Sequence, residues 1–387
     1  MQVLVLNAGS SSLKSALFQL PNETPLWAGS LTGTTLKTTV AGKTTTISVP
    51  PAANPTAQLI ETLWAGPNPV LTGPQAIQAV GHRVVHGGPD FQTSIRITTQ
   101  VKDTIQQLVQ FAPQHNPAGL AGITALEQLL PTVPQVAVFD TAFHRTLPPA
   151  ETVYPGPYAW FEQGIRRYGF HGISHEYCAN HAAQVLGQAV ENLRIVSCHL
   201  GNGCSLAAIR GGKSLATTMG FTPLEGLMMG TRSGSIDPGI LLHLLRTGLT
   251  VDELDHLLYS ESGLLGVSGR SGDMREILAA RAQGDSRSSL AFEVYIHRLQ
   301  AQIGAMMAVL GGLDILLFTG GVGENAPEVR AQATAPFAFM GLHLDPVQNA
   351  RSPQDQNIAQ SGSVPVFIIH TREEWAIAQE CQRVLSD

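Results

Sequence analysis

A strand–turn–strand pattern that occurs twice constrains the fold of this chain more than any other feature. Residues 3–18 run from an apolar stretch through Asn7, Gly9 and three serines into a second apolar stretch. Residues 193–209 repeat this order around a Gly-Asn-Gly-Cys turn. Each copy is typical of two strands joined by a tight turn. Because the copies lie in different halves of the chain, we expect a duplicated domain.

Short apolar runs alternate with amphipathic stretches through the rest of the sequence. Buried strands are expected at residues 135–139, 313–318 and 364–369. Helices are expected at residues 101–111, 118–130, 251–258, 274–282, 288–310 and 373–385. This alternation predicts the α/β class. A proline-rich segment at residues 148–157 is expected to connect two domains.

Composition limits the classes of function. The 387 residues are enough for two domains of ordinary size, and 43% hydrophobic with only 13% charged residues is typical of a globular protein. A net charge of −6 without a basic cluster argues against nucleic acid as the main partner. The four cysteines lack metal-binding spacing and are expected to be reduced. With no signal-peptide pattern and no apolar run of roughly 18 residues, we expect a cytoplasmic protein without a membrane partner.

The opening turn combines groups that suit a polyphosphate. Gly9 allows successive backbone N–H groups to point into one concavity, Lys14 adds a cation, and Asn7 offers an oxygen to a hard metal ion. The turn is not a P-loop, because the G-x-x-x-x-G-K-[ST] spacing is absent. A polar hairpin turn without a ligand is the alternative. Glycine-bearing turns also follow apolar strands at Gly201 and Gly320, and three such turns at strand ends fit a bound nucleotide.

Eight short motifs, in order along the whole chain, resemble those of the acetokinase family of the actin, sugar-kinase and heat-shock ATPase superfamily. They lie at residues 7–14, 81–88, 139–144, 167–172, 199–203, 226–239, 273–275 and 321–325. The resemblance implies two duplicated ribonuclease H-like domains, of the actin-like ATPase type, with a cleft between them. The N-terminal α/β domain would span residues 1–147 and the C-terminal nucleotide-binding domain 148–372. A closing helix at 373–387 would pack back on the N-terminal domain.

The resemblance also implies an activity. Members transfer the γ-phosphoryl group of ATP reversibly to acetate, giving acetyl phosphate and ADP, and they are cytoplasmic homodimers that use Mg²⁺, with Mn²⁺ as a second option. One alternative is the same chemistry on propionate or butyrate. Another is a non-catalytic, nucleotide-dependent binding protein of the actin type.

Nucleotide and metal sites follow from the same resemblance. Phosphates are expected at Lys14, His199, Leu200, Gly201, Asn202 and Gly203. Adenosine is expected at Asp273, Met274, Arg275, Gly321, Val322, Gly323, Glu324 and Asn325. The metal ion is expected at Asn7 and Glu373.

Arg83 lies in an apolar stretch, where an unpaired guanidinium would be costly. From the residues alone, a structural salt bridge is the favoured role. The resemblance instead makes Arg83 the partner of the substrate carboxylate, a role that suits its planar two-point donation. Val85, Phe170 and Pro223 would surround the methyl group of acetate.

Three residues correspond to catalytic positions of the family. His171 and Arg232 would stabilise the charge of the phosphoryl group in the transition state, although each lies near glycines and can equally brace a loop. Asp140 would be the catalytic acid or base, although an Asp before Thr can also cap a turn. A carboxylic acid with a pKa near ~4.3 is already ionised at neutral pH. We therefore expect Asp140 mainly to orient metal-bound water and substrate.

The sequence departs from the family pattern at four positions. Gln114 replaces a Leu that lines the pocket for the methyl group, and Ser235 replaces an Asp. Arg372 replaces the Asn before Glu373, and Ile173 replaces a Thr. Since an amide in an apolar wall needs its own hydrogen-bond partners, Gln114 leaves the chain length of the preferred acid open.

Overall fold

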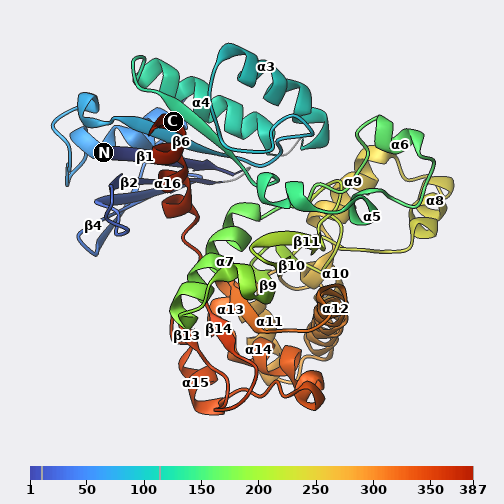
Figure 1. Cartoon of the computed structure of the whole chain (residues 1–387). Coiled ribbons are helices and arrows are strands. Elements are labelled where there is room, and N and C mark those ends of the chain that lie inside the picture. The colour runs from blue at the N-terminus through green and yellow to red at the C-terminus, as the bar shows by residue number, and fades with distance from the viewer. Residues whose placement is uncertain (10–11, 113–114, 387) are drawn as a thin grey trace. The chain divides into compact units, whose positions relative to one another are not determined.

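The computed structural model describes residues 1–9, 12–112 and 115–386, and it divides the chain into two compact units (Figure 1). Unit 1 comprises Met1–Ala142 and Arg372–Asp387, whereas unit 2 comprises Phe143–Thr371. Gln114, one of the predicted departures, lies outside the described residues.

Unit 1 is built on a mixed sheet. Among its described residues the strand order is β5-β4-β3-β2-β1-β6-β8-β7. The bounds are β1 Gln2–Ala8, β2 Ser12–Gln19, β3 Trp27–Thr32, β4 Thr35–Val40, β5 Lys43–Ser48, β6 Ala79–Val84, β7 Ile95–Arg96 and β8 Gln135–Phe139. β1 pairs antiparallel with β2 and parallel with β6, and β6 pairs parallel with β8. The predicted pairing of the two opening strands is therefore confirmed.

Helices cover both faces of this sheet (Figure 1). They are α1 Pro55–Ile60, α2 Thr62–Ala65, α3 Thr99–Gln107, α4 Asn116–Leu129 and α16 Glu373–Ser386. Because side chains alternate along a strand, Leu4 and Leu6 of β1 pack in one cluster with Leu126 of α4. On the opposite face α16 lies directly on β6: a Cβ at Gly81 would come within 2.6 Å of Cys381 Sγ.

Unit 2 repeats this plan. Its described strands follow the order β11-β10-β9-β12-β14-β13, with bounds β9 Arg194–Leu200, β10 Cys204–Arg210, β11 Lys213–Thr217, β12 Ile315–Thr319, β13 Gln356–Asn357 and β14 Val366–Ile368. Its helices are α5 Pro149–Thr152, α6 Ala159–Glu162, α7 Gly172–Leu186, α8 Pro238–Arg246, α9 Val251–Ser260, α10 Gly263–Ser268, α11 Met274–Ala282, α12 Ser286–Leu310, α13 Gly320–Asn325, α14 Pro327–Thr334 and α15 Pro346–Arg351.

α7 and α12 pack against the sheet of unit 2. Ala179 and Ala183 of α7 form a core cluster with Ile195 of β9 and Leu317 of β12. Small alanine side chains allow the helix to approach the strands closely. Toward the other end of β9 the residues that face α7 are polar, among them Ser197 and His199.

The two sheets share one topology. In unit 1 the order β3-β2-β1-β6-β8 matches β11-β10-β9-β12-β14 in unit 2, with an antiparallel meander followed by two parallel strands. This identity confirms the predicted fold class, two duplicated α/β domains of the actin-like ATPase type.

The structure differs from the sequence-based expectations at the boundaries of the units, in helix α7, which was not expected, and after β12. Arg372 was expected in the C-terminal domain but belongs to unit 1. Residues 143–147 were assigned to the N-terminal domain but belong to unit 2, because Phe143 packs in its core and His144 shares a hydrogen bond with Ser214. The segment after β12 was expected to be a turn, yet it starts helix α13 at once. Gly320 makes this possible, since its φ of 76° lies in the left-handed region that glycine tolerates.

Two compositional expectations can also be compared with the structure. All four cysteines are free and buried, as predicted. None of the helices in the described part of the chain combines the length and hydropathy that crossing a lipid bilayer requires.

Candidate active site

In unit 1, polar side chains gather where β1, β6 and β8 end. Arg83 on β6 donates from Nε and Nη2 to the carboxylate of Asp140, with the shortest contact 2.5 Å, and from Nη1 to Asn7 Oδ1 at 3.2 Å. Its Nη1 also lies 4.0 Å from Glu373 Oε2 at the start of α16. Parallel strands present their carboxyl ends at one edge of a sheet, which explains why residues far apart in sequence meet here.

Burial and charge shape the electrostatics of this cluster. The side chain of Asp140 is 1% exposed and that of Arg83 19% exposed. Burial opposes the positive charge of Arg83, but Asp140 and Glu373 outweigh it and hold the pKa of the guanidinium above its ordinary value. Burial and then the charge of Glu373 raise the pKa of Glu374. Asp140 and Glu373 thus favour positive charge in this cluster, where Lys14 is a second cation near Glu374.

The donor set fits a hard cation. Asn7 and Glu373 both contribute oxygens, and both lie near the same Arg83 guanidinium. Within the described residues, no three His, Cys, Asp or Glu side chains gather closely enough to hold a metal ion by themselves. An amide oxygen and a carboxylate oxygen are ligands that suit Mg²⁺, which takes one or two protein oxygens besides phosphate. Lys14 lies opposite Asn7 in the β1–β2 register and is exposed.

Unit 2 contains a cavity of about 620 Å³ that brings together the predicted nucleotide segments. It is lined by Gly201, Asn202, Gly272, Asp273, Met274, Arg275, Leu278, Gly321, Val322, Asn325 and Ala326. Three segments more than 40 residues apart therefore meet in one cavity. A volume of several hundred Å³ is the size range of small-molecule sites.

The predicted nucleotide residues differ in how they relate to this cavity. Asp273 caps α11 and pairs with Arg275 at 2.5 Å at its surface. Glu324 does not line the cavity: its Oε1 accepts from Gly320 N and Thr371 N, and His370 contacts its Oε2. Burial favours the neutral form of Glu324, but these hydrogen bonds lower its pKa. Glu324 therefore stabilises the first turn of α13 and does not contact the cavity. His199, Leu200, Gly203 and Gly323 also lie outside the lining.

His171 and Arg232 flank the same glycine. A Cβ at Gly203 would lie 3.4 Å from Arg232 Nη1 and 3.6 Å from His171 Nε2. Arg232 Nη1 also donates to Pro223 O at 3.2 Å. The His171 ring stacks on that of His199 with centroids 4.2 Å apart. Two potential cationic donors thus face the turn at which the family resemblance implies the phosphates.

The residues predicted to surround the methyl group belong to different units. Phe170 and Pro223 are buried in unit 2, whereas Val85 is half-buried in unit 1. Their common role stays a prediction.

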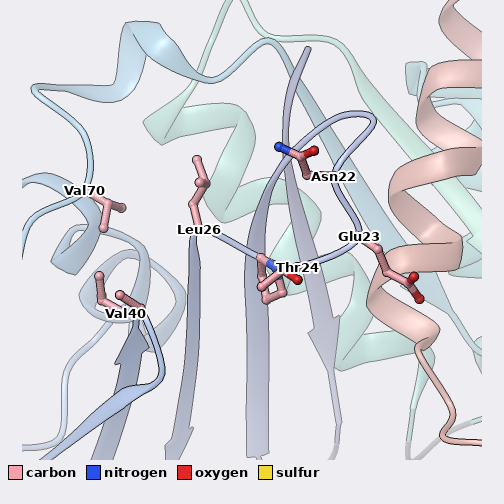
Figure 2. Close-up of a pocket in the computed structure, with 8 residues that line it drawn as sticks. Asn22, Glu23, Thr24, Leu26, Val40 and Val70 are labelled. Atoms are coloured by element: carbon pink, nitrogen blue, oxygen red, sulfur yellow. The ribbon is translucent and has the colours of Figure 1, made fainter.

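Two of the departures have clear local partners. Ser235 Oγ accepts from Gly226 N, and the Ser235 N–H donates to Gly226 O. Ser235 therefore joins the two ends of the loop at residues 226–235. Arg372 Nε contacts Glu23 Oε1 at 3.0 Å. Glu23 lies at a second cavity, of about 650 Å³, in unit 1 (Figure 2). Ile173 is buried on α7.

Sequence reasoning missed two sets of supporting residues. One is a row of buried Ser and His side chains behind His171, for which the i, i+4 spacing of His171 and His175 was the available signal. The other is Arg330, a fully buried cation that donates to the carbonyl oxygens of Gly323 and Glu324 and to Asn349. Nothing in the pattern around Arg330 predicts its burial.

Comparison with known proteins gives consistent results. Residues 2–379 match the acetokinase family. The chain is 56% identical over 399 residues to acetate kinase from Gloeobacter violaceus, covering 98% of each protein. The crystal structure of acetate kinase from Porphyromonas gingivalis is similar, with 40% identity, a TM-score of 0.92 and 99% of each chain covered. A propionate kinase from Francisella tularensis is 38% identical with the same TM-score and coverage.

Proposed function

Because the chain belongs to the acetokinase family, we propose that it transfers the γ-phosphoryl group of ATP to acetate. The products are acetyl phosphate and ADP, and the reaction is reversible. The observation that carries this proposal is the cavity in unit 2 at which residues 201–202, 272–275 and 321–326 converge. Its size and its glycine-rich lining suit a nucleotide.

The nucleotide occupies this cavity in our proposal. Adenosine lies between the Asp273–Arg275 segment and α13, while its phosphates extend toward Gly201, Asn202 and Gly203. Lys14 supplies a further cation for the phosphates. Backbone N–H groups of glycine turns suit this task because no Cβ prevents a close approach.

Mg²⁺ accompanies the nucleotide, with Mn²⁺ as a substitute. Asn7 and Glu373 would hold it through oxygen atoms, the ligands that Mg²⁺ prefers. When bound, the ion neutralises phosphate charge and helps to orient the γ-phosphoryl group.

Arg83 binds the carboxylate of acetate. The Nε–Nη2 edge of its guanidinium already donates to Asp140. The carboxylate of acetate would therefore accept from the edge that carries Nη1 and Nη2. Asp140 holds Arg83 in this orientation and positions the substrate. His171 and Arg232 stabilise the charge that develops on the transferred group. Val85, Phe170 and Pro223 surround the methyl group.

Propionate is the second candidate substrate, because a propionate kinase is among the similar solved structures. An apolar pocket distinguishes one methylene by only about 1–3 kcal/mol, so the two acids differ in kcat/KM rather than in an all-or-none manner. We propose acetate as the preferred acid.

Hydroxylamine trapping tests the function directly. Purified protein is incubated with ATP, Mg²⁺ and hydroxylamine, and acetate, propionate or butyrate is supplied in turn. Acyl phosphate is trapped as the hydroxamate, and we expect the highest kcat/KM with acetate. A higher value with propionate or butyrate would change the substrate but not the reaction. Nucleotide binding without hydroxamate from any acid would leave only the non-catalytic, actin-like alternative.

We also propose that the protein is a cytoplasmic homodimer. Four free, buried cysteines support a reducing compartment. Light scattering of the purified protein tests the dimer, for which twice the mass of one 41.1 kDa chain is expected.

A further inference from the structure

His171 is the first member of a row of hydrogen-bonded side chains that leads into the core of unit 2. Its Nδ1 lies 2.9 Å from Ser205 Oγ. The same oxygen lies 2.8 Å from His175 Nε2, and His175 Nδ1 lies 2.8 Å from Ser197 Oγ. Ser205, His175 and Ser197 are fully buried.

The secondary structure explains why these side chains line up. His171 precedes α7, and His175 is four residues later on the same face of the helix. Ser197 on β9 and Ser205 on β10 lie on the face of the sheet that α7 covers, since Ile195 and Ala207, two residues away on each strand, pack against α7. Between α7 and the sheet, the contacts are thus apolar around Ile195 and Ala207 and polar at the end nearest His171.

Hydrogen bonding along the row has a direction. A serine hydroxyl carries one proton, so Ser205 donates to one imidazole and accepts from the other. Burial holds the pKa of His175 well below its ordinary value, and a neutral imidazole has one N–H and one acceptor nitrogen. Two arrangements of the protons therefore satisfy every hydrogen bond in the row. They differ in whether Ser205 donates to His171 or to His175.

Only one arrangement leaves a neutral His171 able to donate toward the phosphates. When Ser205 donates to His171 Nδ1, the ring proton is on Nε2, the nitrogen that lies near Gly203. In the reverse arrangement a neutral His171 carries its proton on Nδ1 and its Nε2 can only accept. The Arg232 guanidinium beside the same glycine and the positive end of α7 both oppose a second positive charge on His171.

We propose that Ser205, His175 and Ser197 are positioning residues that hold His171 as the neutral tautomer protonated on Nε2. Ser197 donates to His175 Nδ1, His175 Nε2–H donates to Ser205, and Ser205 donates to His171 Nδ1. His171 Nε2–H then faces the turn at Gly203. The catalytic consequence rests on the role proposed above for His171, whereas the tautomer itself does not.

The first test is spectroscopic and needs no substrate. Wild-type protein labelled with ¹⁵N-histidine is recorded at neutral pH in long-range ¹H–¹⁵N spectra, with His171 assigned by the loss of its signals in His171→Gln. We expect a pyridine-like shift for Nδ1 and a pyrrole-like shift for Nε2. A protonated Nδ1 on His171, in either the neutral or the charged ring, would overturn the proposal.

The second test is kinetic. Ser205→Ala removes the hydroxyl that donates to His171 Nδ1. Loss of a residue that orients a metal ligand typically lowers activity by about 10- to 100-fold, and we expect a similar fall in kcat here. The KM values for ATP and acetate should change by less than about threefold, because the transition state is affected more than binding. Ser205→Thr retains the hydroxyl and should restore most of kcat.

Ser214→Ala is the matched control. It removes another buried hydroxyl of unit 2, one that shares a hydrogen bond of 2.8 Å with His144 Nδ1 instead of His171. Its kcat should stay within about twofold of wild type. Equal losses in Ser205→Ala and Ser214→Ala would show a merely structural hydroxyl and refute the kinetic consequence. If Ser205→Ala does not fold, the wild-type spectrum decides. If no acid yields hydroxamate, the proposed function fails while the tautomer is still measured.

Discussion

Replacing Arg83 should damage stability and acetate binding through two separable interactions. In Arg83→Met the buried carboxylate of Asp140 loses its guanidinium partner. Removing one member of a buried pair costs about 3–5 kcal/mol, and we expect the lower end because Arg83 is 19% exposed. In Asp140→Asn the charge disappears but Arg83 still faces Glu373. The double variant should therefore lose less than the sum, with a coupling of about 2 kcal/mol.

The tryptophans allow this stability to be measured for unit 1 alone. Trp27, Trp64 and Trp375 belong to unit 1, whereas Trp160 belongs to unit 2 and is 45% exposed. In a Trp160→Phe background, fluorescence during urea unfolding reports only unit 1. All variants are compared in this background.

The KM for acetate should depend on the presence of Arg83 and not on the coupling energy between Arg83 and Asp140. Loss of the ion pair with the substrate carboxylate costs at least about 2 kcal/mol, which corresponds to a KM for acetate raised about thirtyfold or more. The KM for ATP should change little, and the double variant should not recover the KM for acetate. Lys102→Met, which breaks a surface pair with Glu127, is the control and should cost under about 1 kcal/mol. A normal KM for acetate in an Arg83→Met protein of reduced stability would refute the substrate role.

Three further predictions concern unit 2 and the buried histidines. Arg232→Gln should lower kcat by at least about 100-fold with nearly unchanged KM values in steady-state assays; a normal kcat would exclude its role in the transition state. Arg330→Met should raise the KM for ATP more than that for acetate and lower the melting temperature, because carbonyl oxygens at the end of α13 lose their donor. Burial lowers the pKa of His82 and of His144 to about 4, so between pH 6.5 and 4 the unfolded chain binds protons that the folded chain excludes. Stability is therefore complete above pH 6.5 and falls as the pH decreases, by up to about 3 kcal/mol per histidine; equal urea midpoints at pH 7 and 5 would contradict this.

Local patterns predicted the framework of the fold because strands and turns depend on neighbouring residues. The β1–β2 and β9–β10 strand pairs and several of the longer helices, such as α4, α12 and α16, could be placed from periodicity and glycine alone. The boundary at Ala142 could not, since the proline-rich segment marks a change in composition, whereas Phe143 belongs to unit 2 through packing with residues far along the chain.

The candidate site was predictable in its residue types but not in its supporting contacts. Arg83 was expected to need a partner for its charge, and the structure gives it Asp140. Its role toward the substrate stays a prediction. The row behind His171 depends on the facing of α7 against β9 and β10. Such facing is set by tertiary packing, so residues such as Ser205 carry no signal in the sequence alone.

The origin of α16 has a consequence for the synthesis of the protein. Unit 1 is assembled from the first 142 residues and from the last helix, which packs on β1 and β6. On the ribosome, this sheet emerges early, but one of its faces stays uncovered until α16 has been synthesised. Unit 2 is continuous and can complete its core before unit 1 does. Glu373 arrives with α16, so a prematurely terminated chain lacks both the cover of the sheet and an expected metal ligand.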